Sequence, residues 1–420
     1  MKNTKMRKVR LIAIVLLLCP LSQAQKFSDL PGVVQTRIAA LVASHIDIPV
    51  KLAKVRLRAS DGHLGNLFGF GVAVSGNTVV VASPAFQGNY GGAYVFVKPQ
   101  TGWKDMTQTA KLSGSDWYSA EGFYNVAVSG DTIVAGPTSS GSGAYVFVKP
   151  PGGWVNMTQT ATLNTTEQLY GSAGVAIAGD VVALGYPIAA PQQTGAAAVF
   201  VKPTGGWHDM TQTAILTASD GAIGDQLGWG IATDGKTIVV GAPFATVKSV
   251  KWAGALYVFV RPATGWSDMT QTAKLTPTYE VGGQLGYTTS ISGNTVVSSA
   301  EGNVYVFARP ETGWADMTPS ATLSPPIGQG LISCAAISSG VVVAGSTGPY
   351  PQNYGEVYAF LKPQDGWQTT SSPNALYVPN PDGGPQELGY SIAVNGTTAV
   401  SGAAWFDNGT GAAYVFAPRK

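Results

Sequence analysis

LGWGIATDGKTIVVGAPFATVKSVKWAGALYVFVRPATGWSDMTQTAKL, residues 227–275, is the stretch that decides the fold, because near-copies of it fill the chain from residue 51 onward. Self-similarity at a period of about 50 residues indicates stacked supersecondary units. The Tyr-x-Phe core of the stretch recurs at Tyr94, Tyr145, Ala198, Tyr257, Tyr305, Tyr358 and Tyr414. A Gly-Trp element follows six of these seven cores, at Trp103, Trp154, Trp207, Trp266, Trp314 and Trp367. The chain therefore contains seven repeats.

Each repeat reads as four short strands. In the quoted copy they are residues 229–233, 237–241, 255–260 and 270–275. The second is an unbroken apolar run, which predicts burial on both faces. The fourth carries Thr, Gln and Lys, as is typical of an outer edge strand. A sheet that is apolar on both faces needs cover on both, and radial stacking provides it. We therefore predict an all-β fold, a seven-bladed β-propeller.

The two ends of the repeat region complete each other. The seventh repeat stops before its fourth strand, whereas residues 51–62 resemble a fourth strand without the first three. Alignment of Ser60-Asp61-Gly62 with Ser219-Asp220-Gly221 places Leu57 on Leu216. We predict that this N-terminal strand pairs with residues 412–416 and closes the ring non-covalently.

Two motifs of the repeat resemble a known family. Phe68-Gly69 and Gly241-Ala242-Pro243 match the FG-GAP pattern literally, and Ala82-Ser83-Pro84 and Ala135-Gly136-Pro137 match it more loosely. Over residues 51–416 the chain resembles FG-GAP repeat proteins, the type found in the integrin α-subunit propeller and in many secreted bacterial proteins. This resemblance implies a seven-bladed propeller with a binding or adhesion role.

One property of the family does not carry over to this chain. In integrin-type blades, the turn between the first two strands can hold calcium through an Asp-rich loop, because a hard cation needs several oxygen ligands. The corresponding turns here are short and hold at most one carboxylate, as in Gly179-Asp180 and Gly293-Asn294. We expect no metal at these turns and no cofactor.

Residues 1–24 have the features of a secretory signal peptide. Residues 1–10 carry five basic residues and no acid, residues 11–18 are apolar, and Ser22-Gln23-Ala24 offers a cleavage site. Leu18 disfavours lipid attachment at Cys19, which requires a small residue before the cysteine. The signal predicts export to the periplasm, the cell surface or the medium.

Residues 25–49 follow the signal, and residues 50–420 form the predicted propeller. Within 25–49, apolar residues recur at helical spacing after Asp29 and Pro31, which predicts one short helix. This helix either packs on the propeller or binds a partner.

The charge balance excludes a nucleic-acid partner. The whole chain carries a net charge of +2, and five positive charges lie in the signal, so the exported chain is near −3. Cys334 is then its single cysteine, so no internal disulfide forms. Hydrophobic residues make up 45% and charged residues 11%, which favours a large packed core. We expect a monomer with no integral membrane segment after signal cleavage.

The chain offers no recognisable catalytic motif, and we assign no catalytic residue. Its histidines, His45, His63 and His208, fit no Ser/His/Asp or metal-ligand pattern. Recurring aspartates follow the Gly-Trp element and are interpreted as acceptors for local backbone donors: Asp105, Asp209, Asp268 and Asp316. Loop acids that could supply a carboxylate pair are Glu121, Asp220, Asp225, Glu280 and Asp382.

Variation between repeats is concentrated on one face. In an antiparallel blade, the loop between strands two and three shares a face with the connection that enters the next blade. We call this end of the propeller the variable-loop face, because its connections vary in length and content. They include residues 84–91, 113–122, 186–195, 243–254, 277–283, 346–355 and 403–411.

Aromatic residues are frequent in these connections. About half are expected to pack over the blade ends, and the others to offer amphipathic surfaces to a ligand. The candidates for ligand binding are Phe86, Tyr90, Trp117, Tyr118, Tyr186, Phe244, Trp252, Tyr279, Tyr350, Tyr354, Trp405 and Phe406. The tryptophan of each Gly-Trp element is instead interpreted as packing between blades.

The sequence therefore predicts an exported, non-catalytic propeller that recognises a protein or a glycan through the variable-loop face. Two alternatives stay open. One is an enzyme that acts on carbohydrate through loop carboxylates, and the other is a structural scaffold of the cell envelope. Fold likeness alone does not decide among them.

Overall fold

A computed structural model describes residues 52–84, 91–115, 122–137, 143–165, 174–189, 193–278, 282–326, 330–347, 355–377 and 388–418. These residues belong to one compact unit, Lys51–Lys420. The signal peptide predicted at residues 1–24 and the helix predicted within 25–49 lie outside them. Within the described ranges, every element except the short helix α3 (Phe406–Gly409) is a β-strand.

The strands form seven sheets, numbered here as blades in chain order. Blade 1 consists of β2 (Val72–Ser75), β3 (Thr78–Ser83), β4 (Gly92–Val97) and β6 (Ala110–Ser113). Blade 2 consists of β7 (Phe123–Ser129), β8 (Thr132–Pro137), β9 (Ala144–Val148) and β11 (Ala161–Asn164). Blade 3 consists of β12 (Gly174–Ala178), β13 (Val181–Tyr186), β14 (Ala196–Val201) and β16 (Ala214–Thr217). Blade 4 consists of β17 (Ile231–Thr233), β18 (Thr237–Ala242), β19 (Ala255–Val260) and β21 (Ala273–Leu275).

The remaining blades follow the same order. Blade 5 consists of β22 (Ser290–Ser292), β23 (Thr295–Ala300), β24 (Asn303–Ala308) and β25 (Ala321–Leu323). Blade 6 consists of β26 (Cys334–Ser338), β27 (Val341–Ser346), β28 (Glu356–Leu361) and β29 (Ala375–Tyr377). Blade 7 consists of β30 (Ser391–Asn395), β31 (Thr398–Ala403), β32 (Ala412–Pro418) and β1 (Leu52–Arg58). Four two-residue strands add a fifth strand to a sheet: β5 (Met106–Thr107), β10 (Met157–Thr158), β15 (Met210–Thr211) and β20 (Met269–Thr270).

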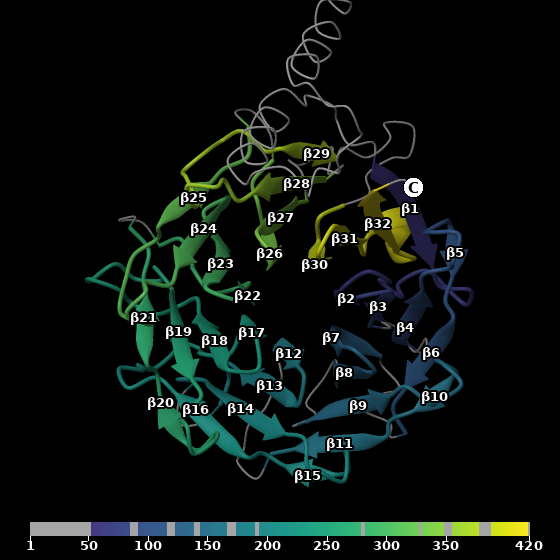
Figure 1. Ribbon diagram of the computed structural model, residues 1–420, viewed down its shortest axis with the longest axis horizontal. Helices are drawn as coiled ribbons and strands as arrows, with labels where there is room; N and C mark the ends of the chain where they lie inside the picture. The colour runs from purple at the N-terminus through teal and green to yellow at the C-terminus, as the bar shows by residue number, and fades with distance from the viewer. Residues whose placement is uncertain are drawn as a thin grey trace, which may run out of the picture. The chain divides into compact units, whose positions relative to one another are not determined.

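The inner strands of the seven blades surround one axis (Figure 1). They contact one another in sequence, and the last contacts the first, in the order β2, β7, β12, β17, β22, β26 and β30. In blade 7, β1 pairs antiparallel with β32, from Leu52 opposite Pro418 to Leu57 opposite Ala413. A strand from the start of the described chain thus shares a sheet with strands from its end. The predicted all-β, seven-bladed propeller is confirmed.

Hydrophobic clusters between neighbouring blades hold the strands together. The second strand is buried on both faces, as its apolar run predicts, and all six residues of β18 are buried. Val240 of that strand shares a cluster with Val199 of blade 3 and with Trp266 of the Gly-Trp element. Every other pair of neighbouring blades shares such a cluster. The Gly-Trp tryptophans pack between blades, as predicted.

Close contact between backbones explains the two glycines of the repeat motif. A Cβ atom on Gly241, in the GAP segment of blade 4, would lie 2.0 Å from the carbonyl oxygen of Gly286, at the start of blade 5. Gly286 also has a φ of +115°, which favours glycine. The same contact between glycines occurs at three further joints, in the pairs Gly185 and Gly228, Gly345 and Gly389, and Gly402 and Gly69. The two halves of the motif therefore meet across a blade boundary.

The outer edge of the blades differs from the prediction. The sequence predicts one strand over residues 270–275, but β21 pairs within blade 4 whereas β20 pairs in parallel with β16 of blade 3. Just before β20, Asp268 Oδ1 accepts a hydrogen bond from the backbone N–H of Ile215, 2.8 Å away. Asp105, Asp209 and Asp316 accept equivalent bonds. The structural role of these aspartates is confirmed, but the donor lies in the preceding blade and is not local.

Candidate ligand-binding face

The variable connections meet at one end of the propeller. The loop between the second and third strands of a blade lies beside the segment that enters the next blade, and parallel bridges join Gly195 to Leu227 and Gly254 to Leu285. At the first of these joints, the backbone N–H of Leu227 donates to the carbonyl of Thr194, 3.0 Å away. At these joints the two classes of loop therefore support each other.

Five of the twelve aromatic residues predicted to bind a ligand lie in the described ranges. Trp252 and Trp405 are 59% and 49% exposed, and Phe244 and Phe406 are half-buried. Tyr186 has no exposed surface and packs in the cluster between blades 2 and 3, so it offers nothing to a ligand, contrary to the prediction. The other seven lie outside the described residues: Phe86, Tyr90, Trp117, Tyr118, Tyr279, Tyr350 and Tyr354.

A second set of aromatic side chains, absent from the sequence-based prediction, stands where the inner strands begin. Each member stands at the start of an inner strand, and the inner strands surround the axis (Figure 1). We call this set the axial aromatic group: Phe70, Tyr124, Trp229, Tyr287 and Tyr390. The ring of Phe70 lies 4.9 Å from that of Tyr124 and 5.0 Å from that of Tyr390, so the group links blades 7, 1 and 2.

In blades 4 and 5 the axial aromatic group is open to solvent. The ring of Tyr287 lies 5.4 Å from that of Trp229 and 5.7 Å from that of Phe244, and Trp229 and Tyr287 are 36% and 38% exposed. Trp229 Nε1 donates to Gln226 Oε1, 2.8 Å away, and Gln226 Nε2 donates to Gln193 Oε1, 3.0 Å away. Edge-to-face packing and these bonds fix the rings. The result is a rigid aromatic surface flanked by carboxamides.

Two of the five loop acids come together in blade 4. Asp220 Oδ2 lies 2.6 Å from Lys274 Nζ, and Asp225, which is 7% exposed, accepts a hydrogen bond from the backbone N–H of Ala222. Burial alone would raise the pKa of Asp220, but the bond and charge of Lys274 outweigh it and lower that pKa. Burial raises the pKa of Asp225, and repulsion from Asp220 adds to this. Glu121, Glu280 and Asp382 lie outside the described residues.

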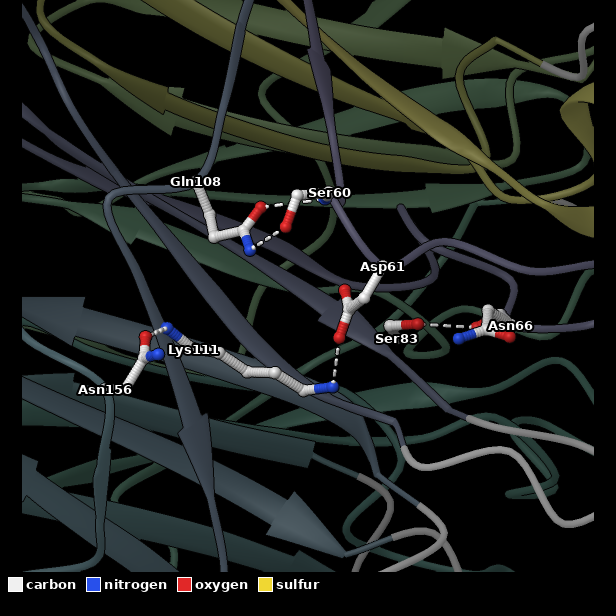
Figure 2. Close-up of polar contacts among 7 residues, drawn as sticks. All are labelled: Ser60, Asp61, Asn66, Ser83, Gln108, Lys111 and Asn156. Atoms are coloured by element: carbon white, nitrogen blue, oxygen red, sulfur yellow. Dashed lines mark hydrogen bonds and ion pairs between the residues drawn. The ribbon is translucent and has the colours of Figure 1, made fainter.

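Blade 1 repeats the ion pair without the second carboxylate (Figure 2). Asp61 Oδ2 lies 2.6 Å from Lys111 Nζ, and Asn66 stands at the position that corresponds to Asp225. Beside them, Gln108 Nε2 donates to Ser60 Oγ, 2.8 Å away, and this contact has a counterpart in blade 4. Because the pair recurs with the same neighbours, it is explained as a connection between the outer strand and the entering segment.

Among the described residues, the remaining histidine and cysteine candidates do not form a catalytic or metal-binding cluster. His208 Nδ1 lies 3.3 Å from the carbonyl oxygen of Gly206, in its own loop. Across the described ranges, no group of three or more His, Cys, Asp and Glu side chains is placed to hold a metal ion. Burial raises the pKa of the Cys334 thiol to about 12, and its Sγ donates to the carbonyl of Gly389. This cysteine is a packed residue of the joint between blades 6 and 7.

The ring of seven four- or five-stranded sheets defines the class of the molecule as a seven-bladed β-propeller. Residues 53–96 and 210–259, both within this propeller, match the FG-GAP repeat family. No curated protein sequence matches the chain. Among solved structures, the computationally designed Ika8 protein is 16% identical, with a TM-score of 0.49 over 87% of this chain and 100% of that one.

Proposed function

We propose that the protein is a non-catalytic recognition module that binds its ligand through the variable-loop face. The observation that carries this proposal is the exposed pair Trp229 and Tyr287 beside the carboxamide of Gln226. Aromatic faces can pack on the apolar side of a sugar ring, while amide and hydroxyl groups bond its polar edge. This combination favours a glycan as the ligand over a protein surface.

We further propose that the pairing of β1 with β32 closes the ring and keeps this face rigid. Six residue pairs join the two strands, and Leu57 is fully buried in the cluster between blades 7 and 1. A surface that is already ordered loses less conformational freedom when it binds. Ring closure therefore supports recognition.

The ligand is proposed to be extracellular or periplasmic. This rests on the signal-peptide features of residues 1–24, which direct a chain to export. Within the described part of the chain, no helix has the length and apolar character needed to cross a membrane. A glycan of the cell surface fits that location.

The absence of turnover is part of the proposal. Asp220 is held by Lys274, and the same pair in blade 1 stands beside Asn66. For the alternative, an enzyme acting on carbohydrate, Asp225 is the candidate acid among the described loop acids, because its pKa is raised. Asp225→Asn is expected to fold, since Asn66 occupies the equivalent site. If the unmodified protein hydrolyses a bound glycan and Asp225→Asn does not, the enzyme alternative would replace the proposal.

A glycan array probed with the purified protein tests the proposal. The variants Trp229→Ala and Tyr287→Ala should each bind the identified glycan with about tenfold or more lower affinity than the unmodified protein. Their melting temperatures should be unchanged. Leu361→Ala is the matched control. Leu361 is 52% exposed at the end of β28 that is opposite the variable-loop face. Binding that neither aromatic variant weakens would contradict the proposed site. Binding to surface proteins alone would change the ligand class.

A further inference from the structure

A small cavity lies on the variable-loop face of blade 7, away from the axial aromatic group. It has a volume of about 200 Å³ and is bounded by the end of β1 and by the loop between β31 and β32. Its lining includes Arg56, Arg58, Phe406, Asp407 and Thr410. The cavity is smaller than the roughly 300–1,000 Å³ typical of sites for whole drug-sized ligands. It would therefore take one chemical group or one small molecule.

Two guanidinium groups make the wall of the cavity positively charged. Arg56 and Arg58 are two residues apart on β1, so both project from one side of the strand, while Val55 and Leu57 are buried on the other. The Arg56 guanidinium carbon lies 5.9 Å from the centre of the Phe406 ring, which holds it at the wall. Burial, and then repulsion from Arg56, lowers the pKa of Lys54. The strand therefore presents concentrated positive charge.

Comparison with other blades shows that, within the described ranges, no carboxylate is paired with this charge, although the Arg56 side chain hydrogen-bonds Tyr414. The position of Arg56 corresponds to Lys111 in blade 1 and Lys274 in blade 4, and each of these lysines is paired with an aspartate 2.6 Å away. Among the described residues, neither Arg56 nor Arg58 forms an ion pair. Blade 7 thus replaces a neutralised lysine with an arginine that faces a cavity.

The loop on the other side of the cavity is held in an uncommon conformation. Asp407 and Asn408 have φ values of 49° and 57°, in the left-handed region that non-glycine residues rarely adopt. The turn is fixed by two backbone hydrogen bonds. The N–H of Gly411 donates to the carbonyl oxygen of Phe406, and the N–H of Thr410 donates to the carbonyl oxygen of Asp407. This conformation carries Asp407 into the lining, so the cavity holds two positive groups and one negative group.

We propose that this cavity binds a single-charge oxyanion, such as the carboxylate of a small molecule or of an acidic sugar. Guanidinium groups bind carboxylates in two parallel hydrogen bonds, and two such groups here exceed the charge of Asp407. Asp407 selects against anions of higher charge. The proposal is independent of the recognition site at the propeller axis.

Calorimetric titration of the purified protein at low salt tests this site with sodium acetate, sodium glucuronate, sodium sulfate and neutral glucose. Acetate and glucuronate should bind saturably, sulfate more weakly, and glucose not at all. Tighter binding of glucuronate than of acetate would identify an acidic sugar as the source of the carboxylate. Equal affinities would identify a small carboxylate.

Variants assign the binding to the cavity. Arg58→Gln should weaken binding about tenfold, because Arg58 is exposed and its loss leaves the fold intact. Arg56→Lys should fold, since blades 1 and 4 carry lysine there, and should weaken binding by less. Asp407→Asn should tighten binding several-fold. Arg261→Gln, an exposed arginine elsewhere, and Trp229→Ala should leave it unchanged. No saturable binding, or equal effects of Arg58→Gln and Arg261→Gln, would overturn the proposal.

Discussion

The two ends of the propeller differ in what they repeat. At the end opposite the variable-loop face, a turn N–H bonds to the side chain that ends the preceding inner strand, as Gly130 does to Ser75 Oγ and Gly179 to Ser129 Oγ. At the variable-loop face, the corresponding sequence position is aromatic in five repeats, as in Phe70 and Trp229, but is Ala173 in the third and Ser333 in the sixth. The difference teaches that a contact repeated in most blades marks a joint. A position whose residue changes from blade to blade marks a surface that can diverge.

Removal of the β1 strand is expected to have the largest effect on the contacts between blades. Deletion of residues 51–58 would leave β32 as an exposed edge and open the cluster that contains Leu57. We expect aggregation or a large fall in melting temperature, measured by differential scanning calorimetry and light scattering. Unchanged thermal unfolding would show that the ring does not depend on this strand.

Two tryptophans compare a joint with the variable-loop face directly. Trp266 is 6% exposed between blades 3 and 4, whereas Trp252 is 59% exposed in a loop. Trp266→Ala should cost about 3–5 kcal/mol of unfolding free energy, as expected for a large core truncation. Trp252→Ala should change it by less than about 0.5 kcal/mol. Similar losses for both variants in urea unfolding would remove the distinction.

Two glycines make the same comparison through the backbone. Gly241→Ala places a Cβ 2.0 Å from the carbonyl oxygen of Gly286, whereas a Cβ on Gly205 meets no atom within 4 Å. Gly241→Ala should destabilise the protein by about 1–3 kcal/mol, because the two blades must move apart. Gly205→Ala should be neutral or slightly stabilising. Equal melting temperatures for the two variants would contradict the close contact between blades.

The smallest expected effect concerns the ion pair of blade 4. The pKa of Asp220 is lowered in the folded protein, so its pairing with Lys274 adds stability above the unfolded pKa of about 3.9 and loses it as the pH falls through the folded value. Both partners are partly exposed, so the gain should stay below about 1 kcal/mol. Lys274→Met should lower the melting temperature at pH 7, and the difference from the unmodified protein should shrink as the pH falls through the lowered pKa of Asp220. A pH-independent difference would assign the loss to packing on Tyr257.

The sequence predicts the number of blades and the buried second strand, because a long repeat averages out local ambiguity. It does not predict that Thr270 pairs with the preceding blade, since a two-residue strand has no periodicity. It also fails to separate Tyr186 from exposed loop aromatics, because burial there depends on the neighbouring blade. It does not predict Trp229 and Tyr287 as exposed candidates, because they stand at the start of inner strands and not in the variable connections. The change of residue at that position from blade to blade is the signal that would have found them.

We propose that ligand recognition depends on the exposed pair Trp229 and Tyr287 and that folding does not. Affinity and melting temperature of Trp229→Ala, measured on one preparation against the glycan that the array identifies, test it most directly. The claim predicts an affinity about tenfold or more below that of the unmodified protein, with a melting temperature within about 2 °C of it. An unchanged affinity, or a fall in melting temperature as large as that of Trp266→Ala, would contradict it.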